Sequence, residues 1–167
     1  MQSTPLDKKR HKRHRFDCGV EALNNYLKVM ANQQSTRDNS KTYVLESPED
    51  PARIIGFYTL TMISVDLGIL PPKLQKKHRN HNTAALIARL AVDKQYVGRG
   101  FGAWLLIDAL KKLLMASEAV AFPLIVVDAK EGVSDFYEKF GFRSFTNENG
   151  RLYMSVADVR TSSKGNP

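Results

Sequence analysis

The sequence predicts an α/β protein with a central mixed sheet flanked by helices. Stretches rich in Ile, Val, Phe and Tyr alternate with stretches whose apolar residues recur at helical spacing, as in layered folds. Past the middle of the chain, an apolar strand runs into a glycine-containing loop that opens a helix. A chain of 167 residues suits one domain. We expect that domain over residues 1–160, with a basic segment at 1–15 and a polar, disordered tail at 161–167.

The first half of the chain is expected to form a helix and two strands. Apolar residues follow Asp17 at helical spacing, so Asp17 is expected to cap a helix that fades in the polar stretch 33–40. Two stretches typical of strands come next, at 43–45 and 53–65. Two prolines then start a basic loop over residues 71–81.

The second half contains the pattern that predicts a ligand site. Residues 84–92 are apolar apart from Arg89, which is typical of a strand buried on both faces. A loop at 93–100 and a helix from about residue 100 to 117 follow this strand. A charged side chain inside such a strand needs a partner or a function. We expect Arg89 either to face an acceptor substrate or to pair with a buried carboxylate.

The last third is expected to complete the sheet. Residues 124–128 predict another buried strand, and residues 131–140 predict a short helix. Gly141 fits the left-handed position that ends such a helix. A final hairpin is expected to turn at Asn149-Gly150, a dipeptide typical of tight turns.

Composition excludes several classes of protein. No apolar run approaches the roughly 20 residues of a membrane-spanning helix, and no apolar stretch follows the basic N-terminus as in a secretory signal. Cys18 is the only cysteine, which rules out an internal disulfide and argues against a structural zinc site. We therefore expect a cytoplasmic protein with no membrane contact and no metal.

The net charge of +8 is concentrated in two segments. Residues 1–15 hold six lysines and arginines against one acid, and residues 71–80 hold four such cations and no acid. All four histidines lie in or beside these segments and are expected to be exposed. Basic patches suit a polyanionic partner such as RNA, because binding phosphates releases counterions. Solvated surface segments without a ligand are the alternative, and it stays open.

The loop at residues 95–102 (Gln-Tyr-Val-Gly-Arg-Gly-Phe-Gly) predicts an anion site. Its glycines permit a ligand to approach the backbone, and the helix that follows directs its positive end at the loop. Arg99 adds a charge that suits phosphate. The spacing is neither that of a Rossmann fingerprint nor that of a Walker loop. A tight turn without a ligand is the alternative.

Residues 95–100 match the Gln/Arg-x-x-Gly-x-Gly/Ala signature of GNAT acetyltransferases, which binds the pyrophosphate of coenzyme A. Residues 89–92 resemble the splayed strand of that family, whose backbone pairs with the pantetheine arm. Residues 136–142 (Phe-Tyr-Glu-Lys-Phe-Gly-Phe) resemble its C-terminal Phe-Tyr element. The resemblance implies a GNAT fold with acetyl-CoA as cosubstrate. It implies binding by Leu90, Ala91, Val92, Gln95, Tyr96, Val97, Gly98, Arg99, Gly100, Phe101, Gly102 and Phe140.

A narrower resemblance covers almost the whole chain. Stretches at 15–19, 23–27, 42–44, 55–60 and 126–129 are similar to the GNAT toxins of bacterial type II toxin–antitoxin modules. Those toxins acetylate the α-amine of aminoacyl-tRNA and so block translation. The resemblance implies the same substrate here, a ribbon-helix-helix antitoxin and a homodimer. The residues expected to contact RNA are Arg89, Lys76, Lys77, Arg79, Arg13 and Arg15.

Tyr137 is the candidate catalytic residue, because the matching tyrosine of the family lies beside the sulfur and a phenol suits proton donation to a thiolate. No general base is evident. Cys18 is better explained as a buried thiol than as a nucleophile, and Asp17 as a helix cap than as an acid. Two other functions stay open: acetylation of a small amine or a protein N-terminus, and a binding module without turnover.

Overall fold

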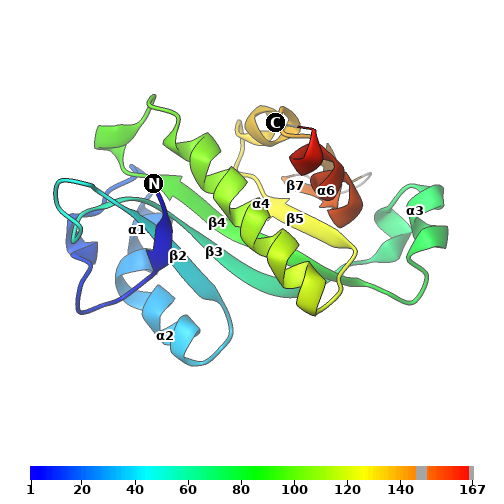
Figure 1. Ribbon diagram of the computed structural model, residues 1–167, viewed down its shortest axis with the longest axis horizontal. Coiled ribbons are helices and arrows are strands. Elements are labelled where there is room, and N and C mark those ends of the chain that lie inside the picture. The colour runs from blue at the N-terminus through cyan, green and yellow to red at the C-terminus, as the bar shows by residue number, and fades with distance from the viewer. Residues whose placement is uncertain (146–149, 166–167) are drawn as a thin grey trace. The chain divides into compact units, whose positions relative to one another are not determined.

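The computed structural model describes residues 1–145 and 150–165 (Figure 1). The chain divides into two compact units. The first unit comprises Met1–Thr61 and Ala88–Ala109, and the second comprises Met62–Ile87 and Leu110–Pro167. The prediction of a single domain over residues 1–160 stays a prediction. Within the described part of the chain, no helix is both long and apolar enough to cross a membrane.

The strands confirm the predicted fold class, a mixed sheet flanked by helices. In the first unit they follow the order β1-β2-β3-β4, and in the second the order β4-β5-β7-β6, in a sheet of seven strands. The pairs β1–β2 and β2–β3 are antiparallel, whereas β4 and β5 are parallel. The strand bounds are β1 Ser3–Pro5, β2 Lys41–Glu46, β3 Ile54–Ser64, β4 Thr83–Val92, β5 Leu124–Asp128, β6 Arg143–Ser144 and β7 Arg151–Ser155.

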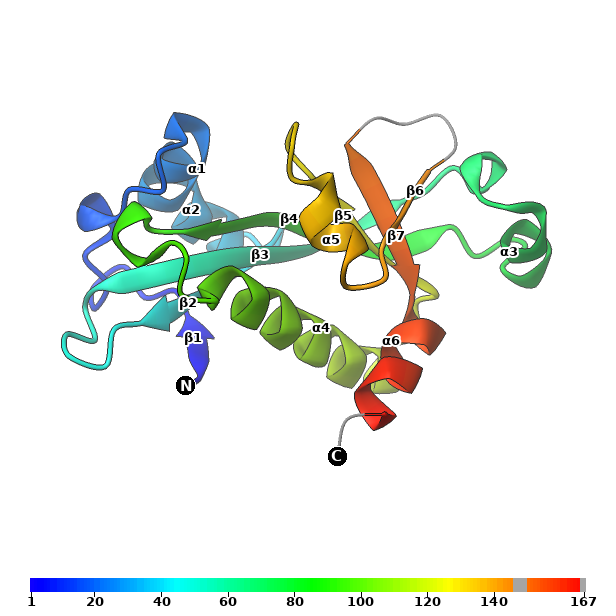
Figure 2. The same cartoon turned by 90° about the horizontal axis from the view of Figure 1, so that it is seen from above.

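Helices cover both faces of the strands in the first unit. Figure 2 shows α1 and α2 on one side of β3 and the beginning of α4 on the other. Helix α1 (Glu21–Asn25) continues through a π-helical segment, Tyr26–Met30, into α2 (Ala31–Thr36). The remaining helices are α3 Pro72–Lys77, α4 Phe101–Ala119, α5 Ser134–Glu138 and α6 Val156–Lys164.

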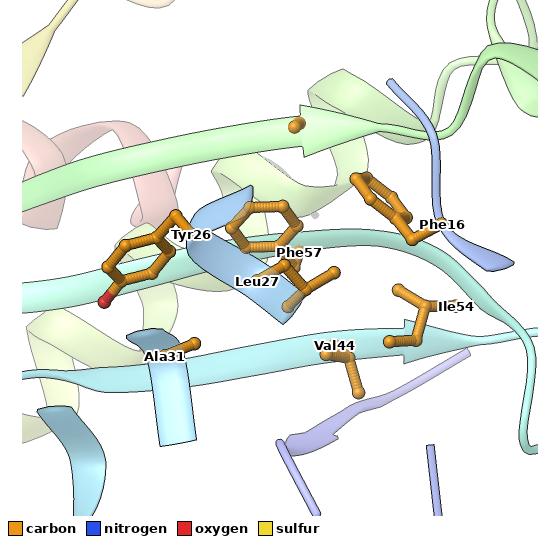
Figure 3. Packing of buried hydrophobic residues seen from close by; sticks show 8 residues of the cluster. Phe16, Tyr26, Leu27, Ala31, Val44, Ile54 and Phe57 are labelled. Atoms are coloured by element: carbon orange, nitrogen blue, oxygen red, sulfur yellow. The ribbon is translucent and has the colours of Figure 1, made fainter. Parts of the chain in front are cut away.

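The core of the first unit lies between this helical stretch and the strands (Figure 3). It consists of Phe16, Tyr26, Leu27, Ala31, Val44, Ile54, Phe57 and Ala91. The rings of Phe16 and Phe57 meet edge to face with centroids 5.4 Å apart, an arrangement that aromatic pairs favour. Gly56 permits close packing here, because a Cβ at that position would lie 2.6 Å from Leu105 Cδ1 and 2.8 Å from the Ala91 carbonyl oxygen.

The basic segment at 1–15 is part of the fold. Strand β1 pairs with β2, and Ser3 is 4% exposed. Asp108 of α4 accepts hydrogen bonds from Tyr58 Oη and Ser3 Oγ, both at 2.5 Å. The hydrogen bonds therefore join β1, β3 and α4 within the first unit. Nothing in the short polar run that forms β1 signals a strand, because its pairing partner lies about 40 residues away along the chain.

The predicted helix start at Asp17 is wrong. Helix α1 begins at Glu21 after Val20, and Asp17 is not its cap. The Asp17 carboxylate instead accepts hydrogen bonds from Gly19 N and Asn24 Nδ2, each at 2.9 Å, in the turn before the helix. The expected disordered tail is also wrong in part, because α6 extends to Lys164. Ser155 caps α6 by accepting a hydrogen bond from Asp158 N at 3.0 Å.

Other predicted elements differ only in extent. The expected basic loop at 71–81 contains α3, since a proline is readily accepted in the first turn of a helix. The helix expected at 131–140 is limited to α5. Gly141 has the predicted left-handed conformation, with φ of +98°. Asn149 of the predicted hairpin turn lies outside the described residues, whereas Gly150 has φ of +84°.

Candidate functional site

The loop after β4 is fixed at its start by Asp93, which is 1% exposed. Its Oδ1 atom accepts a hydrogen bond from Gln95 N at 2.9 Å, and its carbonyl oxygen accepts one from Tyr96 N at 2.8 Å. Its Oδ2 atom accepts one from Asp17 N at 3.1 Å. These bonds build a short 3-10 turn, η4 (Lys94–Tyr96), and set the direction in which the chain enters the glycines.

The two central glycines adopt a backbone conformation that other residues avoid. Gly98 has φ of +80° and Gly100 has φ of +82°. No atom lies within 4 Å of the position that a Cβ would take at either residue. Glycine is therefore required by the left-handed backbone and not by crowding. Helix α4 starts directly after this turn, with Trp104 N donating to Gly100 O at 3.1 Å.

Arg53 of the first unit contributes to this loop, although its sequence context gave no sign of it. Its Nη2 atom donates to Gln95 Oε1 at 2.8 Å and lies 3.4 Å from Asp93 Oδ2. Its guanidinium carbon lies 5.9 Å from the centroid of the Tyr96 ring, and that of Arg99 lies 5.4 Å from the same centroid. Two arginines therefore flank one aromatic ring beside the glycines.

A cavity of about 390 Å³ lies against this loop. It is lined by Ser47, Pro48, Glu49, Ile55, Gln95, Tyr96, Arg99 and Phe101. The buried Arg53 Nε has no hydrogen-bond partner in the described part of the chain, and a buried donor of this kind is normally satisfied. Arg99 in this lining, with the left-handed glycines beside it, fits a diphosphate, which offers many acceptor oxygens and negative charge.

The end of β4 leads into the loop. The described β4–β5 ladder joins Ala84–Ile87 to Leu124–Val127, so Leu90, Ala91 and Val92 lie beyond it along β4. Asp93 N, directly after them, donates to Ile55 O at 2.8 Å. A strand that continues past its parallel ladder is the feature expected of a splayed strand.

Arg89 stacks on an aromatic ring. Its guanidinium carbon lies 3.6 Å from the centroid of the Tyr26 ring, an arrangement typical of a cation–π contact. No ion pair with a carboxylate is found for Arg89 among the described residues. The Tyr26 ring is thus a partner for the charged Arg89 side chain, which the sequence analysis expected to need one. Contact between Arg89 and an acceptor substrate stays a prediction.

Tyr137 lies on α5 of the second unit and is 6% exposed. Burial and the negative charge of Asp128 raise the pKa of its phenol to about 12. Its ring contacts Phe136 and Phe142 edge to face, with centroids 5.1 and 5.9 Å away. In the described part of the chain, no hydrogen bond to the Tyr137 hydroxyl is found. The ring is thus held in place by its aromatic neighbours, and its part in proton donation stays a prediction.

Phe140 packs against Phe136 with centroids 5.3 Å apart.

Cys18 is only half-buried, and its Sγ lies 3.7 Å from Val20 O. The cysteine packs against the first unit's core.

The predicted RNA-binding residues differ in their surroundings. Lys76, Lys77 and Arg79 are exposed on or just after α3. Arg15 is also exposed but forms an ion pair with Asp50 at 3.1 Å, and Arg13 is half-buried. The expectation that every histidine is exposed is wrong for His11, which is 4% exposed. Its Nε2 atom lies 2.8 Å from Glu46 Oε1, a partner far away in the sequence.

Comparison with known proteins adds to this geometry. A family model described as an acetyltransferase (GNAT) domain matches residues 38–144. The chain is 29% identical to "Probable toxin TacT" of Sinorhizobium fredii, over 94% of this chain and 92% of that protein. It is also 29% identical to a "tRNA-acetylating toxin" of Mycobacterium tuberculosis, over 87% of this chain and 86% of that protein.

Solved structures give the same picture. AtaT complexed with acetyl-methionyl-tRNAfMet has a TM-score of 0.85 and 28% identity, covering 97% of this chain and 98% of that one. AtaTR bound with acetyl-CoA has a TM-score of 0.82 and 26% identity, covering 97% of both chains. The similarity thus extends over nearly the whole chain, including both units.

Proposed function

The chain belongs to the GNAT acetyltransferase family, and we propose that it transfers the acetyl group of acetyl-CoA to the α-amine of aminoacyl-tRNA, which blocks translation. The observation that carries this proposal is the intact loop of Gly98, Arg99 and Gly100, in a chain whose whole length resembles tRNA-acetylating relatives. One relative is named a tRNA-acetylating toxin, and AtaT was solved with acetyl-methionyl-tRNAfMet. The basic α3 segment of this chain suits the same class of substrate.

The loop of the first unit is assigned to the pyrophosphate of acetyl-CoA. The left-handed glycines leave the backbone open to a diphosphate, and Arg53 and Arg99 supply positive charge. Leu90–Val92 at the end of β4 are assigned to the pantetheine arm, through main-chain hydrogen bonds. The other assigned binding residues are Gln95, Tyr96, Val97, Phe101, Gly102 and Phe140. When bound, acetyl-CoA supplies a thioester carbonyl that an amine attacks.

Tyr137 is assigned as the proton donor to the departing thiolate. With a pKa raised to about 12, its phenol keeps its proton at every physiological pH. A thiolate that leaves beside this hydroxyl takes up the proton at the moment when its negative charge develops. The attacking α-amine of an aminoacyl ester is weakly basic, so it loses its own proton to water without a dedicated base.

The acceptor RNA is assigned to basic side chains. Lys76, Lys77 and Arg79 of the second unit form the main phosphate-binding group, because none has an ion pair in the described part of the chain. Arg13 and Arg15 form a weaker group, since Asp50 already neutralises Arg15. Arg89 is assigned to the end of the tRNA that carries the amino acid.

The proposal extends to partners. A toxin of this kind requires a neutralising antitoxin, for which a ribbon-helix-helix protein is expected, and it acts in the cytoplasm as a homodimer. The relative named probable toxin TacT, and a solved structure of the AtaT toxin bound to the C-terminus of the antitoxin AtaR, support this assignment.

The test is in vitro translation with purified protein and labelled acetyl-CoA, scoring label on aminoacyl-tRNA. We expect label on the tRNA and arrested translation, both lost in Tyr137→Phe. Tyr43→Phe is a matched control, because Tyr43 is also a packed tyrosine, stacked on Tyr58 in the first unit. Acetyl-CoA binding without labelled RNA would instead favour a small amine or a protein N-terminus as the acceptor. Binding without any turnover would favour a module that only holds its ligand.

A further inference from the structure

The second unit contains a groove whose lining residues, apart from Lys77, have no role in the proposed function. Its volume is about 300 Å³, and it lies between α3, the strands β6 and β7, and the start of α6. Figure 2 shows α3 on the β6 side of β7. The side chains that define its chemistry are Lys73, Leu74, Lys77, Arg143, Tyr153 and Asp158. A volume of this order is at the small end of the range for ligand pockets.

Positive charge dominates the groove. Lys73 and Lys77 are four residues apart on α3, a spacing that places two side chains on the same face of a helix. Arg143 on β6 supplies a third cation. None of the three forms an ion pair in the described part of the chain, and Asp158 is the single acid that lines the groove. A ligand with negative charge would therefore find cations that no carboxylate of the described chain already neutralises.

Tyr153 is a further residue that lines the groove. The residue is 4% exposed, and its ring packs on Phe145 with centroids 4.8 Å apart. Its hydroxyl has no hydrogen-bond partner among the described residues and is not itself one of their buried unpaired polar atoms. The phenol thus offers a ligand one neutral donor beside the three cations.

The chemistry of the lining favours phosphate over other anions. The planar guanidinium of Arg143 can donate two parallel hydrogen bonds to phosphate oxygens, and the two lysines act as mobile point charges. Leu74 and Met154 supply apolar surface beside these charges, against which a nucleobase can pack. The combination fits a nucleotide of an RNA strand better than a free inorganic ion.

We infer that the groove formed by Lys73, Lys77, Arg143 and Tyr153 binds a phosphodiester of the acceptor RNA. This inference rests on the proposed function and extends it, because it adds Lys73, Arg143 and Tyr153 to the RNA-binding residues. The groove is a site separate in its residues from the loop of the first unit, which binds the phosphates of acetyl-CoA.

The test compares two double variants that remove the same charge from the full-length protein. Lys73→Gln with Arg143→Gln empties the groove of two cations. Lys111→Gln with Lys164→Gln removes two exposed cations of the second unit outside the groove. Binding of deacylated tRNA is measured over a salt series, and binding of acetyl-CoA is measured alongside. A competitor series uses inorganic phosphate, a short single-stranded RNA and polyglutamate.

The groove variant should lower the salt slope by about 0.7, the contribution of the one single-strand phosphate contact that the groove makes. At about 0.1 M salt its affinity for tRNA should fall on the order of tenfold, while the control keeps most of its affinity. Acetyl-CoA binding should be unchanged in both. RNA should compete far better than inorganic phosphate at equal phosphate concentration.

Equal tRNA binding by the groove variant and its control would overturn the inference. So would displacement by polyglutamate as efficient as displacement by RNA, which would indicate an acidic protein segment as the ligand. The wild-type protein separates this outcome from a failure of the proposed function. If the wild type acetylates aminoacyl-tRNA and the groove variant binds tRNA normally, only the groove assignment is refuted.

Discussion

Two segments of this chain are strongly basic in sequence and differ in the structure. The N-terminal segment at 8–15 packs against β2, where Arg10 and His11 both contact the carboxylate of Glu46, at 2.7 and 2.8 Å. The α3 segment at 73–79 contains four cations, and none forms an ion pair in the described part of the chain. Arg10, His11 and Arg15 of the first segment are therefore engaged by carboxylates of the fold, whereas the cations of the second remain available to a ligand.

The comparison shows why a count of charges cannot identify a binding surface. Ion pairs at exposed positions contribute little to stability, but they decide whether a cation is free to bind phosphate. Glu46 and Asp50, which pair with side chains of the N-terminal segment, lie more than 30 residues away along the chain. Only the fold reveals these partners.

The largest difference between the segments should appear in RNA binding. We expect Lys76→Gln with Lys77→Gln and Arg79→Gln to lower tRNA affinity on the order of 10²-fold at about 0.1 M salt, because three phosphate contacts are lost. Filter binding over a salt series measures the effect and the change in slope. A loss below about threefold, with an unchanged slope, would show that α3 is a solvated surface.

Removal of the shared carboxylate should affect folding and not RNA binding. Glu46→Gln leaves Arg10 without an ion pair and weakens the hydrogen bond to the buried His11, so we expect a loss of about 1–3 kcal/mol in the free energy of unfolding. Urea denaturation measures this loss. Thr4→Val is a useful comparison, because it removes a single hydrogen bond that an uncharged hydroxyl donates to the same carboxylate. An unchanged midpoint in Glu46→Gln would mean that the N-terminal segment is held by β1 alone.

The same carboxylate should make stability depend on acid pH. Burial raises the pKa of Glu46, but hydrogen bonds from His11 and Thr4 and the charge of Arg10 outweigh it and hold the pKa below the ordinary value of 4.5. A carboxyl with a lowered pKa stabilises the fold above its ordinary value, and that stability is lost as the pH falls through the folded-state value. Urea midpoints of the wild type should therefore converge on those of Glu46→Gln as the pH is lowered below 4.5. If the difference between the two urea midpoints stays constant as the pH falls, other groups are responsible for the acid sensitivity.

The smallest effect is expected at the paired arginines. Arg10→Gln with Arg15→Gln should lower tRNA affinity by less than about threefold, because each charge is already balanced by a carboxylate, and exposed pairs contribute only ~0–1 kcal/mol to stability. The same filter-binding assay applies. A loss as large as that of the α3 variant would remove the distinction between the two segments.

The sequence predicted the parts of the site that depend on local pattern. The apolar strand β4 and the left-handed glycines follow from residue type and spacing, and the structure has both. Tyr137 was identified by resemblance to the family, and its catalytic role stays a prediction. Arg53 was missed because its role depends on Asp93 and Gln95, about 40 residues later in the chain. The buried His11 was missed for the same reason.

Local signals were also overlooked. Ser155 followed by Asp158 has the spacing of a helix N-terminus, and this pair begins α6, in a region that the sequence suggested would end as a hairpin and a tail. Asp17 has the residue type of a cap, yet it bonds within the preceding turn, because Gly19 with φ of +81° delays the start of the helix. Residue type alone thus locates a boundary less well than the backbone conformation around it.

Trp104 is the single tryptophan of the chain, and its amide begins α4 by donating to Gly100. The tryptophan emission of the protein therefore originates one helical turn from the loop assigned to acetyl-CoA. A half-buried indole at this position responds to changes in local polarity. Occupancy of the loop can thus be followed optically in the unlabelled protein, without an RNA substrate and without turnover.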